Sequence, residues 1–141
     1  MSPPPPEVLR WVEDRFGPAR VVAPLGGGCI NPAVRVQFPS RVAFLKYNEH
    51  PPPAFFSIEA PGLEALRAVA SSLRMPEVLG VCGPTAPEDV PGPGALLLEW
   101  LVPQLRRAVY QLFYLLVHVN LFGAGYLLRT ESTLRRALSA R

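Results

Sequence analysis

The chain has 141 residues, a net charge of +3 and 49% hydrophobic residues, which is the size of one ordinary domain. Its basic residues are scattered along the sequence rather than gathered in blocks, so the charge pattern gives little support to a nucleic-acid-binding surface. The two cysteines, Cys29 and Cys82, fit no zinc-binding spacing, and no secretory signal precedes them. We therefore expect a reduced, cytoplasmic chain.

The first third of the chain predicts one short helix followed by three strands. After a proline run at residues 1–6, apolar residues at helical spacing predict a helix over 7–16. Apolar runs then predict strands at 20–25, 31–38 and 42–47. Because the turns between these strands are short, we expect an antiparallel meander rather than β-α-β units.

The middle third predicts a longer helix and two more strands. Leucine, valine and alanine recur at helical spacing over residues 57–73, and Ser57 is a candidate N-cap. Apolar stretches at 75–82 and 94–101 predict strands on either side of a connection rich in proline and glycine. Residues 20–102 thus predict an α+β fold of about five strands, with one helix inserted after the third strand.

The last third predicts helices with too few partners. Residues 104–119 predict an apolar helix and residues 130–140 a final one. An uncharged stretch at 108–128 is long enough to span a membrane, but its polar residues and mid-segment tyrosines favour a buried helix followed by a glycine turn. Residues 1–102 offer too little surface to cover both helices, and we expect poor solubility or self-association through them.

Lys46 is the only lysine of the chain, and every other basic residue is arginine. A lysine supplies a compact point charge, whereas arginine supplies a broad planar fork. Kinase-type folds hold ATP phosphates with a lysine on a strand that follows a glycine-rich turn. The lysine supplies its charge, and the turn supplies backbone amides. Two alternatives remain. The lysine could be retained by chance in an arginine-biased sequence, and the glycine-rich turn could be an ordinary hairpin turn. The turn lacks the Lys-Ser/Thr ending of a Walker loop and consists of Gly26, Gly27, Gly28, Cys29, Ile30 and Asn31.

Glu59 is the candidate partner of Lys46, near the start of the helix predicted at 57–73. In kinase-type folds a helix carboxylate pairs with the strand lysine and aims it at the phosphates, although an acid in a first turn can also serve as a cap. Pro61 disfavours helical geometry at the residue before it, so we expect Glu59 just outside the helix. At the end of the last strand, backbone groups of Glu99, Trp100 and Leu101 could face an adenine, or the strand could simply be core.

Four stretches together resemble the fructosamine (ketosamine) kinase family, which is similar to aminoglycoside phosphotransferases and shares the protein-kinase-like fold. They are Gly-Gly-Gly-Cys-Ile-Asn (26–31), Phe-Leu-Lys-Tyr-Asn (44–48), Phe-x-x-Glu-Ala-x-Gly-Leu-x-x-Leu (56–66) and Leu-Leu-Glu-Trp-Leu (97–101). The resemblance resumes at 110–126, which looks like the end of the same family's C-terminal lobe. It implies a protein-kinase-like N-terminal lobe at 1–102 and a C-terminal helical remnant of a truncated lobe at 103–141.

The resemblance also implies a chemistry. The intact family phosphorylates the sugar moiety of glycated amines with ATP and Mg²⁺, a step in protein deglycation. By this resemblance residues 26–31 contact phosphates, Lys46 binds the α- and β-phosphates, Glu59 orients Lys46, and residues 99–101 hold the adenine. A ketosamine is the expected substrate of the intact family, with no nucleic acid or membrane partner.

The catalytic part of the pattern is missing from the sequence. The family's His-Gly-Asp-Leu loop and its later magnesium-binding aspartate have no counterpart, since the only two aspartates, Asp14 and Asp89, lack the required neighbours. We predict no significant kinase turnover, no catalytic residue and no metal ligand in this chain. An internal deletion or a degenerate remnant would each explain it, and a pseudokinase-like ATP-binding or interaction module, or a non-functional fragment, is the alternative. Cys29 could be a redox-sensitive thiol or a small packing residue.

Overall fold

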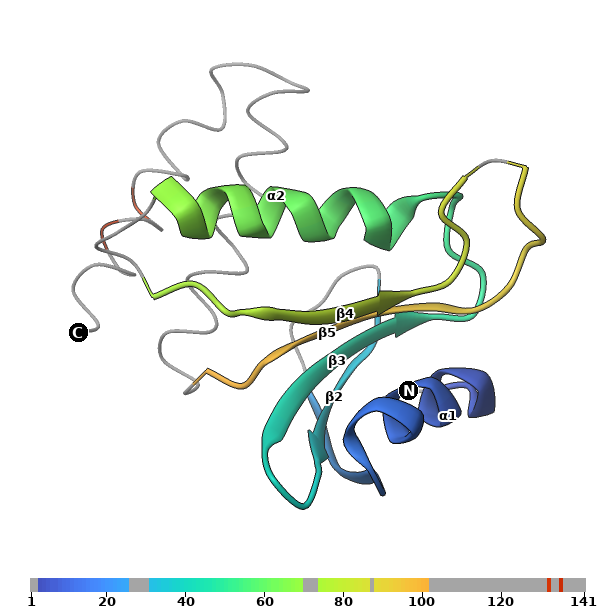
Figure 1. The fold of residues 1–141 in the computed structure, drawn as a ribbon, viewed down its shortest axis with the longest axis horizontal. Coiled ribbons are helices and arrows are strands. Elements are labelled where there is room, and N and C mark those ends of the chain that lie inside the picture. The colour runs from blue at the N-terminus through green and yellow to red at the C-terminus, as the bar shows by residue number, and fades with distance from the viewer. Residues whose placement is uncertain are drawn as a thin grey trace. The chain divides into compact units, whose positions relative to one another are not determined.

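The computed structural model describes residues 3–25, 31–69, 74–86 and 88–101, together with Ser132 and Arg135. The chain divides into two compact units, Met1–Glu64 with Pro76–Trp100 and Ala65–Met75 with Leu101–Arg141. The lobe boundary expected at residue 102 lies outside the described residues and stays a prediction, as do the helices expected at 104–119 and 130–140. In chain order the described elements are α1 (Pro6–Phe16), β1 (Arg20–Leu25), β2 (Ala33–Gln37), β3 (Val42–Asn48), α2 (Phe55–Val69), β4 (Val78–Cys82) and β5 (Gly94–Glu99) (Figure 1).

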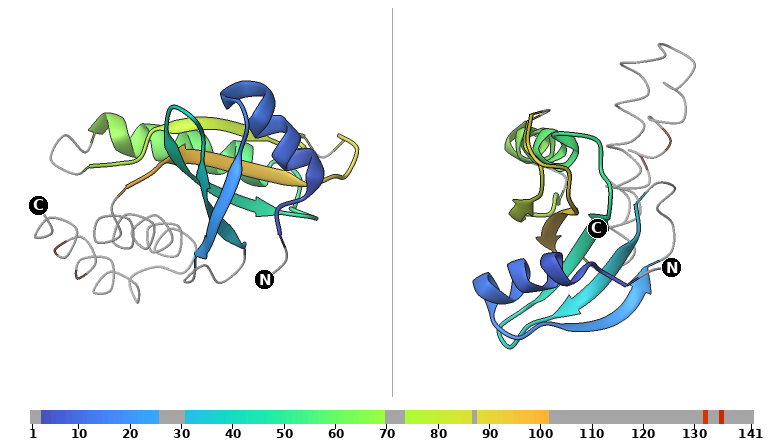
Figure 2. Two further views of the ribbon diagram at one scale, coloured as in Figure 1. Left: turned by 90° about the horizontal axis from the view of Figure 1, so that it is seen from below. Right: turned by 90° about the vertical axis from the view of Figure 1, so that its right-hand side faces the viewer.

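The five strands form one antiparallel sheet with the order β1-β2-β3-β5-β4. The first three strands are the predicted meander, and the tight turn between β2 and β3 is closed by a 2.8 Å bond from the Phe38 backbone N–H to the Arg41 carbonyl. β5 then inserts between β3 and β4, with α2 in the connection that precedes β4 (Figure 2). The predicted α+β fold is confirmed, with the strand and helix arrangement of a kinase-like N-terminal lobe.

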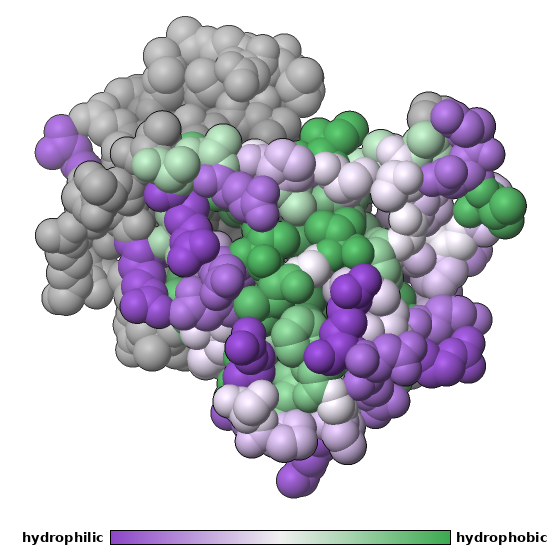
Figure 3. All heavy atoms as spheres, viewed as in Figure 1, coloured by the Kyte–Doolittle hydropathy of each residue, from purple (hydrophilic) through white to green (hydrophobic). Residues whose placement is uncertain are grey.

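The two outer strands of the sheet are only partly covered. All five residues of β4 are half-buried, and each outer strand contains a register shift, between Val21 and Ala23 in β1 and between Val78 and Gly80 in β4. Hydrophobic residues gather near the middle of the face that Figure 3 shows, where β4 runs. Such bulges twist an edge strand and disrupt the ladder that another chain would use for pairing.

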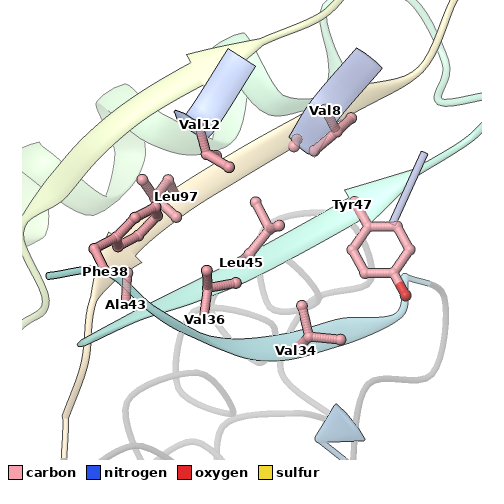
Figure 4. Close-up of a cluster of buried hydrophobic side chains, with 10 residues drawn as sticks. Val8, Val12, Val34, Val36, Phe38, Ala43, Leu45, Tyr47 and Leu97 are labelled. Atoms are coloured by element: carbon pink, nitrogen blue, oxygen red, sulfur yellow. The ribbon is translucent and has the colours of Figure 1, made fainter. Parts of the chain in front are cut away.

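The hydrophobic core lies between α1 and one face of the sheet. Val8 and Val12, one helical turn apart on α1, are fully buried against the strands (Figure 4). Trp11 of the same helix packs on β4, where a Cβ added to Gly80 would lie 3.0 Å from the indole Cζ2. The other members of this cluster alternate along the chain, as one face of a sheet requires. They are Val34, Val36, Ala43, Leu45, Tyr47, Ala95 and Leu97 on the strands, and Phe38 directly after β2.

The other face of the sheet carries Lys46 and packs against α2. Phe44 and Lys46 alternate with the core residues of β3, so their side chains leave the sheet on the opposite side from α1. The helix contributes Phe56, Ala60 and Leu63, each at most 5% exposed. Their spacing of three and four residues gives α2 one apolar face toward the sheet.

The start of α2 differs from the prediction. The helix begins at Phe55 rather than at Ser57, and Pro61 lies inside it. Ser57 is therefore not the N-cap, and its hydroxyl donates to the Ala54 carbonyl at 3.0 Å. The expectation that Glu59 lies outside the helix is wrong, because packing of the apolar face outweighs the backbone bond that Pro61 cannot make.

One prediction concerned a membrane-spanning helix. No helix among the described residues is long and apolar enough to cross a bilayer. The uncharged stretch at 108–128, for which the sequence favours a buried helix, lies outside those residues.

Candidate nucleotide-binding site

Lys46 and Glu59 form a buried ion pair between β3 and α2. The Lys46 Nζ atom lies 2.7 Å from Glu59 Oε1 and 2.8 Å from Oε2, so the ammonium bonds both carboxylate oxygens. The two residues are 7% and 6% exposed. Charges removed from water to this degree require a partner, and here each supplies it for the other. The ion pair predicted from the sequence is confirmed.

Two aromatic rings from the start of α2 lie close to the ammonium. The Lys46 Nζ atom is 5.7 Å from the ring centroid of Phe55 and 6.0 Å from that of Phe56. The rings contact each other edge to face, with centroids 5.1 Å apart. Aromatic faces attract a cation and displace water, which lowers the local dielectric constant and strengthens the field of the lysine.

Asn31 reaches the same face of the sheet from the end of the glycine-rich turn. Its Oδ1 atom accepts a 2.7 Å bond from Asn48 Nδ2, and Ala33, two residues further on, pairs with Lys46. Asn31 is 3% exposed, and no described atom accepts a hydrogen bond from its Nδ2 group. The remaining predicted turn residues, Gly26, Gly27, Gly28, Cys29 and Ile30, lie outside the described residues.

The predicted adenine-binding residues follow the end of β5. Glu99 is the last residue of that strand, and its backbone N–H donates to the Glu77 carbonyl at 2.9 Å. The Arg35 guanidinium stacks over Trp100 at 5.2 Å from the ring centroid, and Leu101 is 3% exposed. The adenine contact predicted for the backbone of Glu99, Trp100 and Leu101 stays a prediction.

The two aspartates of the chain lie on other elements than this ion pair. Asp14 is exposed on α1, the helix that covers the opposite face of the sheet. Asp89 lies in the β4–β5 connection, where its Oδ2 accepts from the Thr85 N–H at 2.7 Å, the Thr85 hydroxyl at 2.9 Å and the Ala86 N–H at 3.0 Å. The backbone bond from Thr85, followed by those from Ala86 and the hydroxyl, lowers the pKa of Asp89. Across the described part of the chain, no three histidine, cysteine, aspartate or glutamate side chains could hold a metal ion.

Sequence reasoning assigned no role to three residues of this site, Asn48, Phe55 and Phe56. Asn48 belongs to the same quoted stretch as Lys46, and strand alternation places it on the lysine's face of the sheet. That spacing was a usable signal. The positions of Phe55 and Phe56 next to the lysine could not be predicted in this way, because they depend on the residue at which α2 begins.

Comparison with known proteins decides the family. A family model described as fructosamine kinase matches residues 7–105 and 102–140. The chain belongs to the fructosamine kinase family. No curated protein matches the chain.

Among solved structures, a protein from Haemophilus somnus 129PT named "putative fructosamine-3-kinase" is similar to this fructosamine kinase family chain, with 24% sequence identity and a TM-score of 0.48. The match covers 77% of this chain and 35% of that one. The chain therefore spans about a third of the length of this solved relative, and the family model, not this likeness, carries the assignment.

Proposed function

We propose that the chain is the nucleotide-binding lobe of a fructosamine kinase family protein and binds ATP through Lys46. The buried ion pair of Lys46 with Glu59 carries this proposal. A buried ion pair is rarely the most stable filling of a core, because apolar residues of similar volume are often as stable or more so. The only lysine of the chain is buried at this site, where burial of its charge costs free energy. A function of the lysine charge in ligand binding best explains this.

Each predicted residue has a role in this proposal. Glu59 holds the ammonium in place, and Lys46 offers its charge to the α- and β-phosphates. Residues 26–31 supply backbone amides to phosphate oxygens, and the backbone after β5 supplies the adenine contact. A nucleotide fits the described residues, which offer a buried cation and an unused amide donor on one face of the sheet. Magnesium does not fit them, since Asp14 lies on α1, which covers the opposite face, and the Asp89 Oδ2 atom already accepts from Thr85 and Ala86.

We propose further that the chain by itself binds ATP without transferring phosphate. The reaction of the intact family is phosphorylation of the sugar moiety of glycated amines. We propose the cytoplasm as the location of the protein. Phosphoryl transfer needs a metal to neutralise charge and a base to orient the attacking hydroxyl. The two segments of the family match meet at residues 102–105, which supports a chain without the catalytic middle. We expect no ADP above background when the protein is incubated with Mg-ATP and a fructosyl-lysine peptide; sustained turnover that depends on Lys46 would contradict this.

Thermal melting with and without Mg-ATP tests the binding proposal. We expect nucleotide to raise the melting temperature of the wild-type chain, because a ligand that binds only the folded state stabilises it. Lys46→Met combined with Glu59→Leu removes both charges together and should abolish the rise while the variant stays folded. Arg10→Met, which removes an exposed cation from α1, is the matched control and should keep the full rise.

The outcome of that experiment separates two readings of the lobe. Equal stabilisation of the wild type and the double variant would show that any nucleotide binds elsewhere. If the wild-type chain melts cooperatively and nucleotide does not change its melting temperature, the result would favour an interaction module instead.

A further inference from the structure

The side-chain amide of Asn31 has a buried donor without a use. Its Nδ2 group has no hydrogen-bond partner in the described part of the chain, although Asn31 is only 3% exposed. Buried polar groups of folded proteins are nearly always paired, and an orphaned one is a candidate contact for a missing ligand or ion. The amide nitrogen can only donate, so its missing partner is an acceptor and not a metal ion.

The orientation of this amide is fixed by a backbone group. Asparagine oxygen and nitrogen are assigned from the hydrogen-bond network around them. Here the backbone N–H of His50 donates to Asn48 Oδ1 at 2.8 Å, and a backbone N–H cannot accept. Asn48 must therefore present its Nδ2 group to Asn31, whose Oδ1 accepts at 2.7 Å. The group that Asn31 has left over is its donor.

The unused donor lies on the face of the sheet that carries Lys46. Ala33 pairs with Lys46, and the Tyr47 N–H donates to the Pro32 carbonyl at 3.1 Å, which continues the antiparallel ladder. Asn31 therefore lies opposite Asn48, and strand alternation places both on the lysine's side. Asn31 is also the last residue of the glycine-rich turn, two residues before β2 begins at Ala33.

We propose that Asn48 is a positioning residue that fixes the amide of Asn31 so that its Nδ2 group donates to a phosphate oxygen of the bound nucleotide. The inference rests on the proposed function. Lys46 supplies a charge that attracts phosphate from any direction, whereas a fixed amide donor selects one oxygen and one direction. The hydrogen bond from the His50 backbone thus sets the polarity of a contact two side chains away.

Asn48→Asp tests this because it reverses the polarity at nearly constant shape. The new carboxylate accepts from His50 and from Asn31, so the Asn31 amide turns over and leaves an oxygen toward the ligand. We expect ATP affinity, measured by calorimetry, to fall about tenfold or more. Affinity for adenosine, which has no phosphate, should not change. His50→Asp is the matched control, because it adds the same charge to an exposed side chain and keeps the backbone N–H.

Each other result would overturn the inference. A parallel loss of ATP and adenosine binding would assign Asn48 a purely structural role, and an equal loss in His50→Asp would assign the effect to charge alone. Unchanged ATP affinity in Asn48→Asp would refute the inference and leave the proposed function intact. A wild-type chain that does not bind ATP would refute both. If Asn48→Asp fails to fold, Asn31→Asp leaves the same oxygen in place of the donor and is judged by the same outcomes.

Discussion

Lys46 and Glu59 stabilise the fold only as a pair. Each is almost fully buried, and the two carboxylate oxygens of Glu59 both bond the ammonium. Removal of one member leaves the other as an uncompensated charge in the interior, which costs far more than the net contribution of the intact pair. The pair therefore makes substitution of either residue alone difficult to interpret in a binding experiment.

Single and double substitutions at this pair should differ in the size of their effect on stability. Lys46→Met alone should lower the free energy of unfolding by about 3–5 kcal/mol, because it strands the Glu59 carboxylate. Lys46→Met with Glu59→Leu should recover most of that loss. Urea denaturation of the two variants checks this, and a double variant no more stable than the single one would mean that the site cannot repack.

Cys82 should react slowly in the folded chain. Burial raises the pKa of its thiol to about 11, against smaller lowering effects from a hydrogen bond to the Ala95 backbone and the charge of Arg15. At pH 8 only about one thiol in a thousand is then ionised, roughly a hundredfold fewer than in an unfolded chain. Iodoacetamide labelling, read by peptide mapping to separate Cys82 from Cys29, should show a difference of that order between native and urea-unfolded protein.

The same shift has a consequence for stability. The folded state holds the Cys82 proton more tightly than the unfolded state, so its contribution is complete below pH 9 and is lost as the pH rises through about 11. Labelling of Cys82 at equal rates in native and unfolded protein would contradict the raised pKa.

At the scale of elements, sequence patterns predicted which segments form strands and helices but not how all of them pair. Apolar runs predicted β1, β2 and β3, and the short turns between them predicted their antiparallel pairing. The insertion of β5 between β3 and β4 leaves no trace in periodicity, because the order of strands is set by packing of distant residues.

Local rules also misplaced one element boundary. Pro61 and Ser57 indicated a later start for α2, whereas Phe56, Ala60 and Leu63 hold the helix against the sheet from Phe55 onward. The ion pair could be predicted because kinase-type folds pair a strand lysine with a helix carboxylate, and the sequence shows one lysine on a predicted strand and an acid near the start of a predicted helix. The chain of amides through Asn48 could not, because it depends on three-dimensional hydrogen bonds.

Gly83 should be the least replaceable glycine of the β4–β5 connection. Its φ is +109°, and a Cβ added there would lie 2.6 Å from the Gly94 Cα. Gly83→Ala should therefore lower the free energy of unfolding by about 2–4 kcal/mol, from backbone strain and displacement of β5. Gly92→Ala, in the same connection, is the control because nothing lies within 4 Å of its added Cβ, and it should change stability by less than about 0.5 kcal/mol.

At the scale of the whole molecule, the chain matches its family in two segments and spans 35% of one solved relative. The sequence predicts apolar helices after residue 102 whose partners are missing, and we expect the purified chain to self-associate. Sizing chromatography with light scattering should give a mass above 15.4 kDa that rises with concentration. A shortened chain that ends at residue 102 is the control, and a monodisperse full-length monomer would contradict the prediction.

The strand order also sets the sequence of events during synthesis on the ribosome. β1, β2, β3 and α2 leave the exit tunnel first and can already bring Lys46 to Glu59. β4 follows, but among the described strands it pairs only with β5, which is made later and must enter between β4 and β3. Translation at about 5–20 residues per second gives the nascent chain an interval in which β4 waits without a partner. During that interval the edge of β3 is open to other chains, and it stays so until β5 pairs with it.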